Sequence, residues 1–356
     1  MAENDGLKAE ERVIFKLRAL FQAFGYQQYR MSRFEEYDFY AGKKDFLVGG
    51  DIITFTDRDG KLMALKPDVT LSIVKSVPDG DGVSRICYGE NVYRVSEQSG
   101  KFREIMQTGL ECIGNLGLVE IAEVAVLAQM SLKTISKSCV LTISHMGIVE
   151  SLLAGVPEGV KSLAIGYLSG RNVSALNSLA LENVQWAKAI EKVSALAMMF
   201  GPFEEILGAL REMGADEVSV GELETVVSQL DPDVTRIDFS LLDGMKYYNG
   251  ITFRGFVEGV PTPVLSGGQY DKLMRRMKKK SSAIGFAVYM DALERLLQDR
   301  PEYDVDVVLL YNDTDSVALV LDKAQTLRNQ GFSVVTLKEV PKQLRFREVV
   351  RSGEDV

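Results

Sequence analysis

The chain has 356 residues, of which 46% are hydrophobic and 26% are charged, and its formal net charge at pH 7 is −9. This length allows one large domain with a sizeable core and a small second domain, and the negative charge argues against tRNA or DNA binding, because phosphate backbones attract clustered Lys and Arg. No apolar run is long enough to span a membrane, and the first residues resemble neither a signal peptide nor a transit peptide, so we expect a cytoplasmic protein.

Metal and cofactor motifs are missing from the sequence. Cys87, Cys112 and Cys139 are far apart and odd in number, which predicts neither a zinc site nor a disulfide framework. A lone histidine, His145, cannot form a metal cluster by itself, and we expect it to be structural. Phosphate-loop, dinucleotide-binding, H-E-x-x-H and G-x-S-x-G patterns are also lacking, so no cofactor is expected.

The first quarter of the chain predicts a helix, a hairpin and a second short helix. Apolar residues at helical spacing predict an amphipathic helix over 10–24. Residues 51–56 and 61–66 read as two strands joined by a turn that contains an Asp-Gly pair. Asp68 stands where its side chain can cap the helix that follows.

The middle of the chain predicts strands on both sides of a helical stretch. Residues 86–94 and 103–113 are β-rich runs, and a helix over about 118–136 and a strand over 139–144 follow. Residues 145–230 are mainly helical, with the insertion proper over about 150–230. The β signal then returns, and a helix over 291–298 closes this part; the β-rich runs are 235–244, 247–259 and 281–290. This order predicts an antiparallel α+β domain with a helical insertion.

The tail has a different character. Residues 304–338 read as a strand, a helix and a second strand, which predicts one βαβ-like unit with parallel strands. The charged remainder looks too short to add much more. We therefore expect one domain over 1–300 and a truncated α/β tail over 301–356.

Four separated segments share their order and spacing with one known family. Leu62–Thr70 reads LMALKPDVT against the family's L-R-P-E-G-T, and Val92–Gly114 holds the Q-x-G-x-E pattern. Residues 241–248 read LLDGMKYY against L-V-R-G-L-D-Y-Y and precede a G-G-Q-Y-D match, and Ala283–Leu296 matches G-F-A-x-G-x-E-R-L. On these motifs the chain resembles the histidyl branch of class II aminoacyl-tRNA synthetases, which implies an antiparallel sheet flanked by helices, and a dimer.

The resemblance implies an amino-acid pocket that is largely retained. In the family the position of Asp68 meets the substrate's ammonium group, that of Gln107 lies near the amino-acid backbone, and those of Glu111 and Tyr248 address the imidazole ring. Gln107 and Glu111 are four residues apart, so a strand would place both on one face. The expected ligand-binding residues are Asp68, Thr70, Gln107, Glu111, Tyr247 and Tyr248, with Gly267 and Gly268 as pocket glycines.

The nucleotide side of the family pattern is partly lost. Arg94 matches the arginine that grips the α-phosphate, and Arg103 ends the segment that corresponds to G-R-Y-R. The arginine of L-V-R-G is Asp243 here, and the arginine that should touch the γ-phosphate aligns with Ala292. Loss of one hydrogen-bond donor that stabilises the transition state typically lowers the rate of the catalysed reaction about a hundredfold to a thousandfold. We therefore predict no useful adenylation, and an unpaired Asp243 would repel a substrate carboxylate.

A synthetase-like core without these residues, followed by so short a tail, resembles the regulatory subunit of short-form ATP phosphoribosyltransferase. That family commonly shows L-R-P-D-x-T, which Lys66–Thr70 matches except at Lys66. The resemblance implies a non-catalytic subunit that binds L-histidine, relays feedback in histidine biosynthesis and forms a homodimer within a larger assembly with the catalytic subunit. Membrane and tRNA partners are not expected.

Three other functions remain open on the sequence. The chain would be an active histidyl-tRNA synthetase if an arginine reached the neighbourhood of Asp243 from elsewhere. It would be an amino-acid-activating enzyme without tRNA if another amino acid supported pyrophosphate exchange, or a scaffold if no ligand bound. The basic segment Lys272–Lys280 is interpreted as a solvated helix end, with a phosphate-attracting rim as the alternative.

Overall fold

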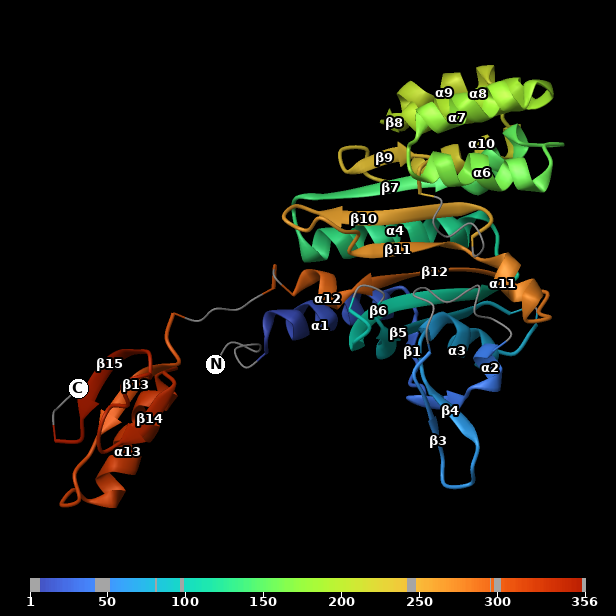
Figure 1. Ribbon diagram of the computed structural model, residues 1–356. Coiled ribbons are helices and arrows are strands. Elements are labelled where there is room, and N and C mark those ends of the chain that lie inside the picture. The colour runs from blue at the N-terminus through green and yellow to red at the C-terminus, as the bar shows by residue number, and fades with distance from the viewer. Residues whose placement is uncertain are drawn as a thin grey trace. The chain divides into compact units, whose positions relative to one another are not determined.

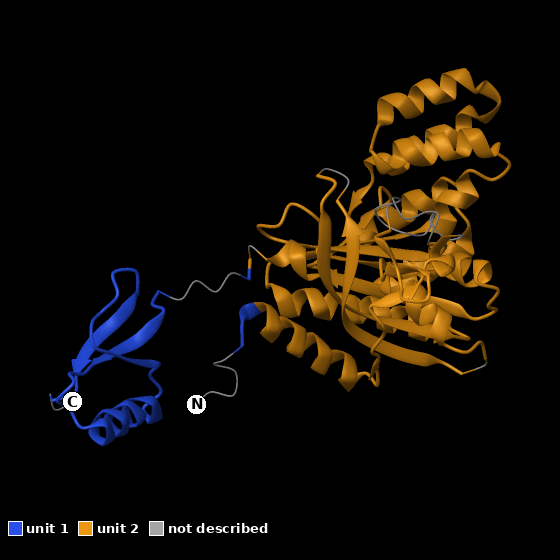
Figure 2. Ribbon diagram, turned by 60° about the horizontal axis from the view of Figure 1, so that its bottom comes forward, with its two compact units in different colours: residues 1–9, 297–356 blue, residues 10–296 orange. Residues whose placement is uncertain are grey.

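Figure 1 shows a computed structural model, which describes residues 7–41, 52–80, 82–96, 99–241, 248–294, 296–297 and 302–353. The chain divides into two compact units, one formed by residues 10–296 and one by residues 1–9 with 297–356 (Figure 2). All the predicted site residues belong to the larger unit, residues 10–296. Each unit is described by itself.

A nine-stranded sheet forms the centre of the larger unit, in the order β1-β5-β6-β12-β11-β10-β7-β9-β8. Neighbouring strands in this sheet are antiparallel, except that β1 is parallel to β5 and β7 is parallel to β9. The predicted α+β class is confirmed, and so are the strands expected near 86–94 and 103–113. The bounds are β1 Gln27–Gln28, β5 Ser84–Val95, β6 Phe102–Gly114, β7 Cys139–His145, β8 Phe200–Gly201, β9 Thr235–Asp238, β10 Ile251–Val257, β11 Leu265–Gln269 and β12 Ser282–Tyr289.

One face of this sheet is covered by the helices α1 (Ala9–Ala23) and α4 (Leu118–Ile135) (Figure 1). Helix α1 buries an apolar stripe that ends at Phe21, whose ring meets the edge of Phe286 on β12 at 5.7 Å between centroids. Gly255 on β10 lets α4 approach, since a β-carbon there would lie 2.5 Å from Leu132 Cδ2. This face is therefore the apolar side of the sheet.

The opposite face carries a small subdomain. The helices α2 (Asp38–Ala41) and α3 (Val69–Ser76) accompany a three-stranded sheet of β2 (Phe34–Glu36), β4 (Leu62–Leu65) and β3 (Thr54–Thr56). The predicted cap is confirmed, because the Asp68 carboxylate accepts the Leu71 N–H at 2.8 Å. A buried cluster that includes Val69, Ile73 and Tyr88 fixes α3 against the sheet.

The predicted helical middle is confirmed as six α-helices and a 3₁₀ turn: α5 Met146–Leu152, α6 Glu158–Ser169, α7 Val173–Glu182, η2 Val184–Trp186, α8 Ala187–Met198, α9 Phe203–Glu212 and α10 Glu217–Val227. His145 caps α5: its Nδ1 accepts the Gly147 N–H at 3.1 Å, and its Nε2 lies 3.0 Å from a Glu222 oxygen. The histidine is structural, as expected. In the described part of the chain, no group of three or more His, Cys, Asp or Glu side chains is placed to hold a metal ion.

The short elements near the end of the larger unit are α11 (Asp271–Arg276) and α12 (Met290–Leu293). In the smaller unit, β13 (Val305–Leu310), α13 (Val317–Asn329) and β14 (Val334–Leu337) form the predicted parallel βαβ arrangement. The expectation that little would follow is wrong, because β15 (Phe346–Arg351) adds a third parallel strand beside β13. None of the helices within the described ranges has the length and apolar character needed to cross a membrane.

Candidate functional site

Glu111 is a buried carboxyl group in the middle of β6, held by two hydroxyl groups. The Thr70 hydroxyl donates to Oε1 and the Tyr270 hydroxyl donates to Oε2, both at 2.6 Å. Burial raises the pKa of Glu111 to about 8, and Asp68 adds to the rise, while the two hydrogen bonds oppose it. Burial therefore favours the protonated form of Glu111, and a cation beside it would favour the ionised form.

Two glycines, Gly285 and Gly268, lie on the same face as this carboxyl group, and Gly267 points to the opposite face, where Phe253 and Phe286 pack. Gly285 on β12 is directly opposite Glu111, and a β-carbon on it would lie 1.8 Å from Glu111 Oε2. Gly268 pairs with Gly285, and its β-carbon would lie 3.0 Å from Tyr248 Cδ1; a β-carbon on Gly267 would lie 2.4 Å from the Gly285 carbonyl oxygen. The two predicted glycines thus permit close approach of β11, β12 and Tyr248.

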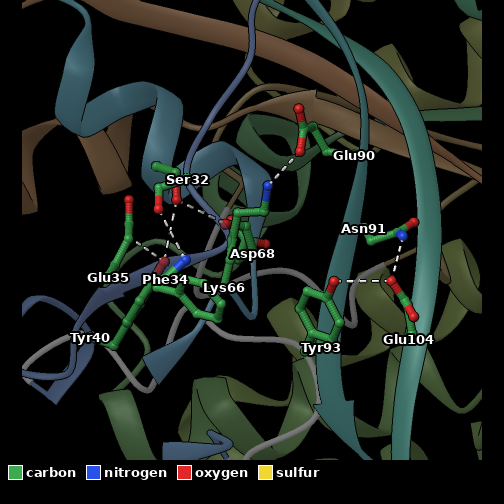
Figure 3. Close-up of polar contacts among 11 residues, drawn as sticks. Ser32, Phe34, Glu35, Tyr40, Lys66, Asp68, Glu90, Asn91, Tyr93 and Glu104 are labelled. Carbon is green, nitrogen blue, oxygen red and sulfur yellow. Dashed lines mark hydrogen bonds and ion pairs between the residues drawn. The ribbon is translucent and has the colours of Figure 1, made fainter. Parts of the chain in front are cut away.

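Asp68 supplies a second acidic group close to the first. Its carboxylate caps α3, and burial raises its pKa although the nearby Arg94 guanidinium opposes the rise. Arg94 Nε donates to the Pro67 carbonyl at 3.0 Å, which holds the guanidinium beside the start of α3. Figure 3 draws Asp68 beside Lys66. The charge of Asp68 also acts on the pKa of Glu111, whose carboxyl group the Thr70 hydroxyl contacts. Asp68, Thr70 and Glu111 are therefore brought together, as predicted.

Gln107 is the other buried polar residue of β6 on this face. The antiparallel register places Gln107 opposite Tyr289 and Glu111 opposite Gly285, so the predicted common face for Gln107 and Glu111 is confirmed. The side chain is 3% exposed, and Nε2 has no hydrogen-bond partner among the described residues. An unpaired buried donor costs about 1–3 kcal/mol, so a hydrogen-bond acceptor beside the Gln107 amide would be stabilising.

Neutral tyrosines line the space between these groups. The Ser266 hydroxyl hydrogen-bonds to both Tyr248 and Tyr289, and burial raises the pKa of both phenols. Tyr88 on β5 lies against Gly109, with its hydroxyl near the Phe286 carbonyl at 3.5 Å. Sequence reasoning found Tyr248 but missed Tyr88, Tyr270 and Ser266. Only strand alternation could have suggested Tyr88, which lies opposite the glycine between Gln107 and Glu111.

The expected nucleotide side is occupied by protein groups. Arg94 and Arg103 are directly opposite each other on β5 and β6. Arg103 Nη2 lies 3.2 Å from an Asp291 carboxylate oxygen, and Ala292 follows in α12. A carboxylate therefore already holds the second arginine. Asp243 and Tyr247 lie outside the described residues.

A buried ion pair adjoins the site and was not predicted. Lys66, which departs from the family's arginine, is completely buried, and its Nζ lies 2.8 Å from Glu90 Oε2 (Figure 3). Glu90 is directly opposite Gln107 across β5 and β6. The ion pair therefore joins the segment before α3, which contains Lys66, to β5, where Glu90 lies opposite Gln107.

The basic segment around α11 makes ordinary structural contacts. Lys272 Nζ lies 2.8 Å from a Glu150 oxygen, and Lys279 Nζ donates to the Val77 carbonyl. Asp79 accepts the backbone N–H groups of Lys280 and Ser281 at 2.9 and 3.0 Å. These contacts agree with the interpretation as a helix end.

Comparison with known proteins places this chain in a family. Residues 4–293 match the family described as histidyl-tRNA synthetase. An ATP phosphoribosyltransferase regulatory subunit from Geobacter sulfurreducens is 29% identical over 337 residues, which cover 89% of this chain and 77% of that protein. One from Caldanaerobacter subterraneus is 29% identical over 360 residues, covering 95% and 94% respectively.

Solved structures share the fold. A crystal structure from Bacillus halodurans, described as an ATP phosphoribosyltransferase regulatory subunit/histidyl-tRNA synthetase, matches with a TM-score of 0.77 at 21% identity, covering 96% of this chain and 93% of that one. A chain of an ATP phosphoribosyl transferase complex from Thermotoga maritima matches with a TM-score of 0.63 at 18% identity, covering 79% and 97% respectively. Both likenesses concern the fold.

Proposed function

This chain belongs to the histidyl-tRNA synthetase family, and from that premise we propose that it is the non-catalytic regulatory subunit of a short-form ATP phosphoribosyltransferase, with L-histidine as its ligand. The names of the relatives at 29% identity support the subunit role.

One observation carries the choice of ligand. Two buried acidic groups, Asp68 and Glu111, lie on the same side of the sheet as the unpartnered amide of Gln107. Buried carboxylates suit an ammonium or imidazolium group through charge-assisted hydrogen bonds, and the amide donor suits a carboxylate or carbonyl oxygen. An α-amino acid with a basic side chain, such as histidine, offers all three groups.

The same geometry argues against activation of the bound amino acid. Adenylate formation develops negative charge on phosphate oxygens and depends on preorganised cations. Arg103 is paired with Asp291, and the position of a second family arginine is Ala292. The alternative of an active synthetase therefore loses support, and tRNA is not expected as a partner.

Regulation requires that histidine bind two states of an assembly with different affinity. We propose that the chain forms a cytoplasmic homodimer within a complex with the catalytic subunit. Histidine would then shift this complex between active and inhibited arrangements. Such a coupling is typically about 1–3 kcal/mol.

Calorimetric titration of the purified chain with L-histidine tests the ligand. We expect saturable binding, which should weaken roughly tenfold or more in Glu111→Gln, because a charged hydrogen bond contributes about 1.5–3 kcal/mol. Glu258→Gln, at an exposed position, is the matched control and should bind normally. Absence of binding in the unmodified chain would refute histidine as the ligand.

Two activity assays test the role. Adding the chain to a short-form catalytic subunit should raise ATP phosphoribosyl transfer and make it sensitive to histidine. Histidine-dependent exchange of pyrophosphate into ATP should be undetectable in the chain alone. Detectable exchange would favour the synthetase alternative, and exchange with another amino acid would favour an activating enzyme without tRNA.

A further inference from the structure

Arg254 lies on the face of the sheet that carries the candidate site, in strand β10, which sequence reasoning did not connect with ligand binding. We propose that its guanidinium group holds the carboxylate of the bound amino acid and so takes over the anion-binding role lost at position 243. This inference rests on the proposed function and identifies how the same site recognises its ligand.

The sheet register places Arg254 on the site face. Arg254 on β10 is directly opposite Ser266 on β11, and Ser266 is opposite Ala287 on β12. Ala287 is in turn opposite Gly109, which lies between Gln107 and Glu111 on β6. Directly paired residues of antiparallel strands point to the same side, so Arg254 shares the face of both predicted site residues.

Neighbouring side chains on the sheet connect Arg254 with Gln107, the hydrogen-bond donor of the site. Ser266, its direct neighbour, hydrogen-bonds to the hydroxyl groups of Tyr248 and Tyr289. Tyr289 is opposite Gln107, whose Nε2 is buried without a partner in the described part of the chain. The positive charges of Arg94 and Arg254 both act to lower the pKa of Tyr289, against a larger rise caused by burial.

The arrangement has two poles. Asp68 and Glu111 form an acidic pole beside Thr70 and Tyr270. The Gln107 amide is a hydrogen-bond donor on the same face, and Arg254 brings a positive charge to that face from β10. An α-amino acid is a zwitterion and matches both poles. The planar guanidinium group presents two parallel N–H donors to a carboxylate, and a partly buried cation is screened less by water than an exposed one.

The backbone around Arg254 is held firmly. The Thr142 hydroxyl on β7 donates to the Arg254 carbonyl at 3.2 Å, and Arg254 pairs with Thr142 on one side and with Ser266 on the other. Gly255 next to it lets α4 pack against the other face of the sheet. A side chain on a central, doubly paired strand is positioned more precisely than one on a loop.

The experiment compares L-histidine with histamine, which lacks only the carboxylate, by calorimetry. The unmodified chain should bind histidine at least tenfold more tightly than histamine. Arg254→Met should weaken histidine binding roughly tenfold to a hundredfold and change histamine binding less than threefold. Arg254→Lys keeps the positive charge but not the two parallel N–H donors of the guanidinium group, and should give an intermediate loss of histidine affinity.

The matched control is Arg236→Met. Arg236 lies in the same cross-strand row on β9, two strands away from Arg254. Its Nη1 donates to the carbonyls of Pro232 and Thr235. Its replacement should leave the preference for histidine unchanged. This control removes the same charge and the same side-chain type from the same row of the sheet.

Two results would overturn the inference alone. One is full histidine affinity in Arg254→Met. The other is an equal weakening of histidine and histamine binding in Arg254→Met and Arg254→Lys, which would mean that Arg254 has a structural role. Failure of the unmodified chain to bind either ligand would instead refute the proposed function, and the inference with it. That result is recorded before any variant is made, so the two failures are distinguishable.

Discussion

Glu111 couples the candidate site to the stability of the fold. Its pKa is about 8 in the folded chain, above the model-peptide value of 4.5, so the folded state binds more protons than the unfolded state between those values. Stability must therefore fall as the pH rises through this window. Between pH 6 and pH 8 we expect a loss of about 2 kcal/mol in the free energy of unfolding, measurable by urea denaturation.

Glu111→Gln supplies the comparison for this pH dependence. The amide has nearly the same shape but does not ionise, so the variant should lose little stability between pH 6 and pH 8. It should be more stable than the unmodified chain at pH 8. Equal pH dependence in the two proteins would show that other groups cause the change.

Gly285 is the residue that allows the Glu111 side chain its position. In Gly285→Ala the new β-carbon would lie 1.8 Å from Glu111 Oε2, so the carboxyl group must move away from Tyr270. We expect a loss of about 1–3 kcal/mol in unfolding free energy and weaker histidine binding, followed by thermal melting and calorimetry.

Gly166→Ala is the control for the glycine substitution. Gly166 lies within α6, and a β-carbon on it would have no atom within 4 Å. Because Gly is unfavourable inside a helix, alanine should stabilise the chain by roughly 0.5–1 kcal/mol. A stabilising Gly285→Ala would contradict the close packing of β12 on Glu111.

At the scale of elements, the Lys66–Glu90 pair joins the segment before α3 to β5. The Lys66 side chain is 0% exposed and the Glu90 side chain 17%. Removal of one partner from a buried pair typically costs about 3–5 kcal/mol, because it leaves the other charge unpaired. Glu90→Gln should therefore destabilise the chain more than Lys66→Met. It leaves the Lys66 charge fully buried, whereas Lys66→Met leaves the Glu90 charge partly exposed to water.

The double variant tests this asymmetry by denaturant unfolding. Lys66→Met with Glu90→Gln leaves no buried charge and should cost less than the two single changes added together. Additive losses, or a larger loss from Lys66→Met than from Glu90→Gln, would show that the pair does not act in this way.

Local patterns in the sequence predicted much of the candidate site. The Asp68 cap and the shared face of Gln107 and Glu111 depend on spacing along the chain, and both are found in the structure. The contact between Tyr270 and Glu111 joins residues 159 positions apart, so no local pattern reveals it. Likewise Lys66 looked like a departure from a motif until its partner Glu90 was visible.

The same difference between local and long-range information appears in the prediction of helices and strands. Strongly periodic segments such as α1 and α4 were placed within one or two residues, because their apolar stripes bury against the sheet. The strand β15 was missed, since its charged sequence resembles a surface segment. It is a strand because β13 offers an open edge beside it.

For the whole molecule, the proposed regulation makes a reciprocal prediction. If histidine changes the affinity between this chain and the catalytic subunit by some factor, the catalytic subunit must change the affinity for histidine by the same factor, typically about 5–150-fold. Calorimetry of histidine with the chain alone and with a saturating catalytic subunit gives one ratio. The affinity of the two subunits with and without histidine gives the other. Unequal ratios would mean a second histidine site or a change in oligomeric state. Two ratios equal to one would mean that histidine binds this chain without regulating the complex, because a ligand with equal affinity for both states shifts neither.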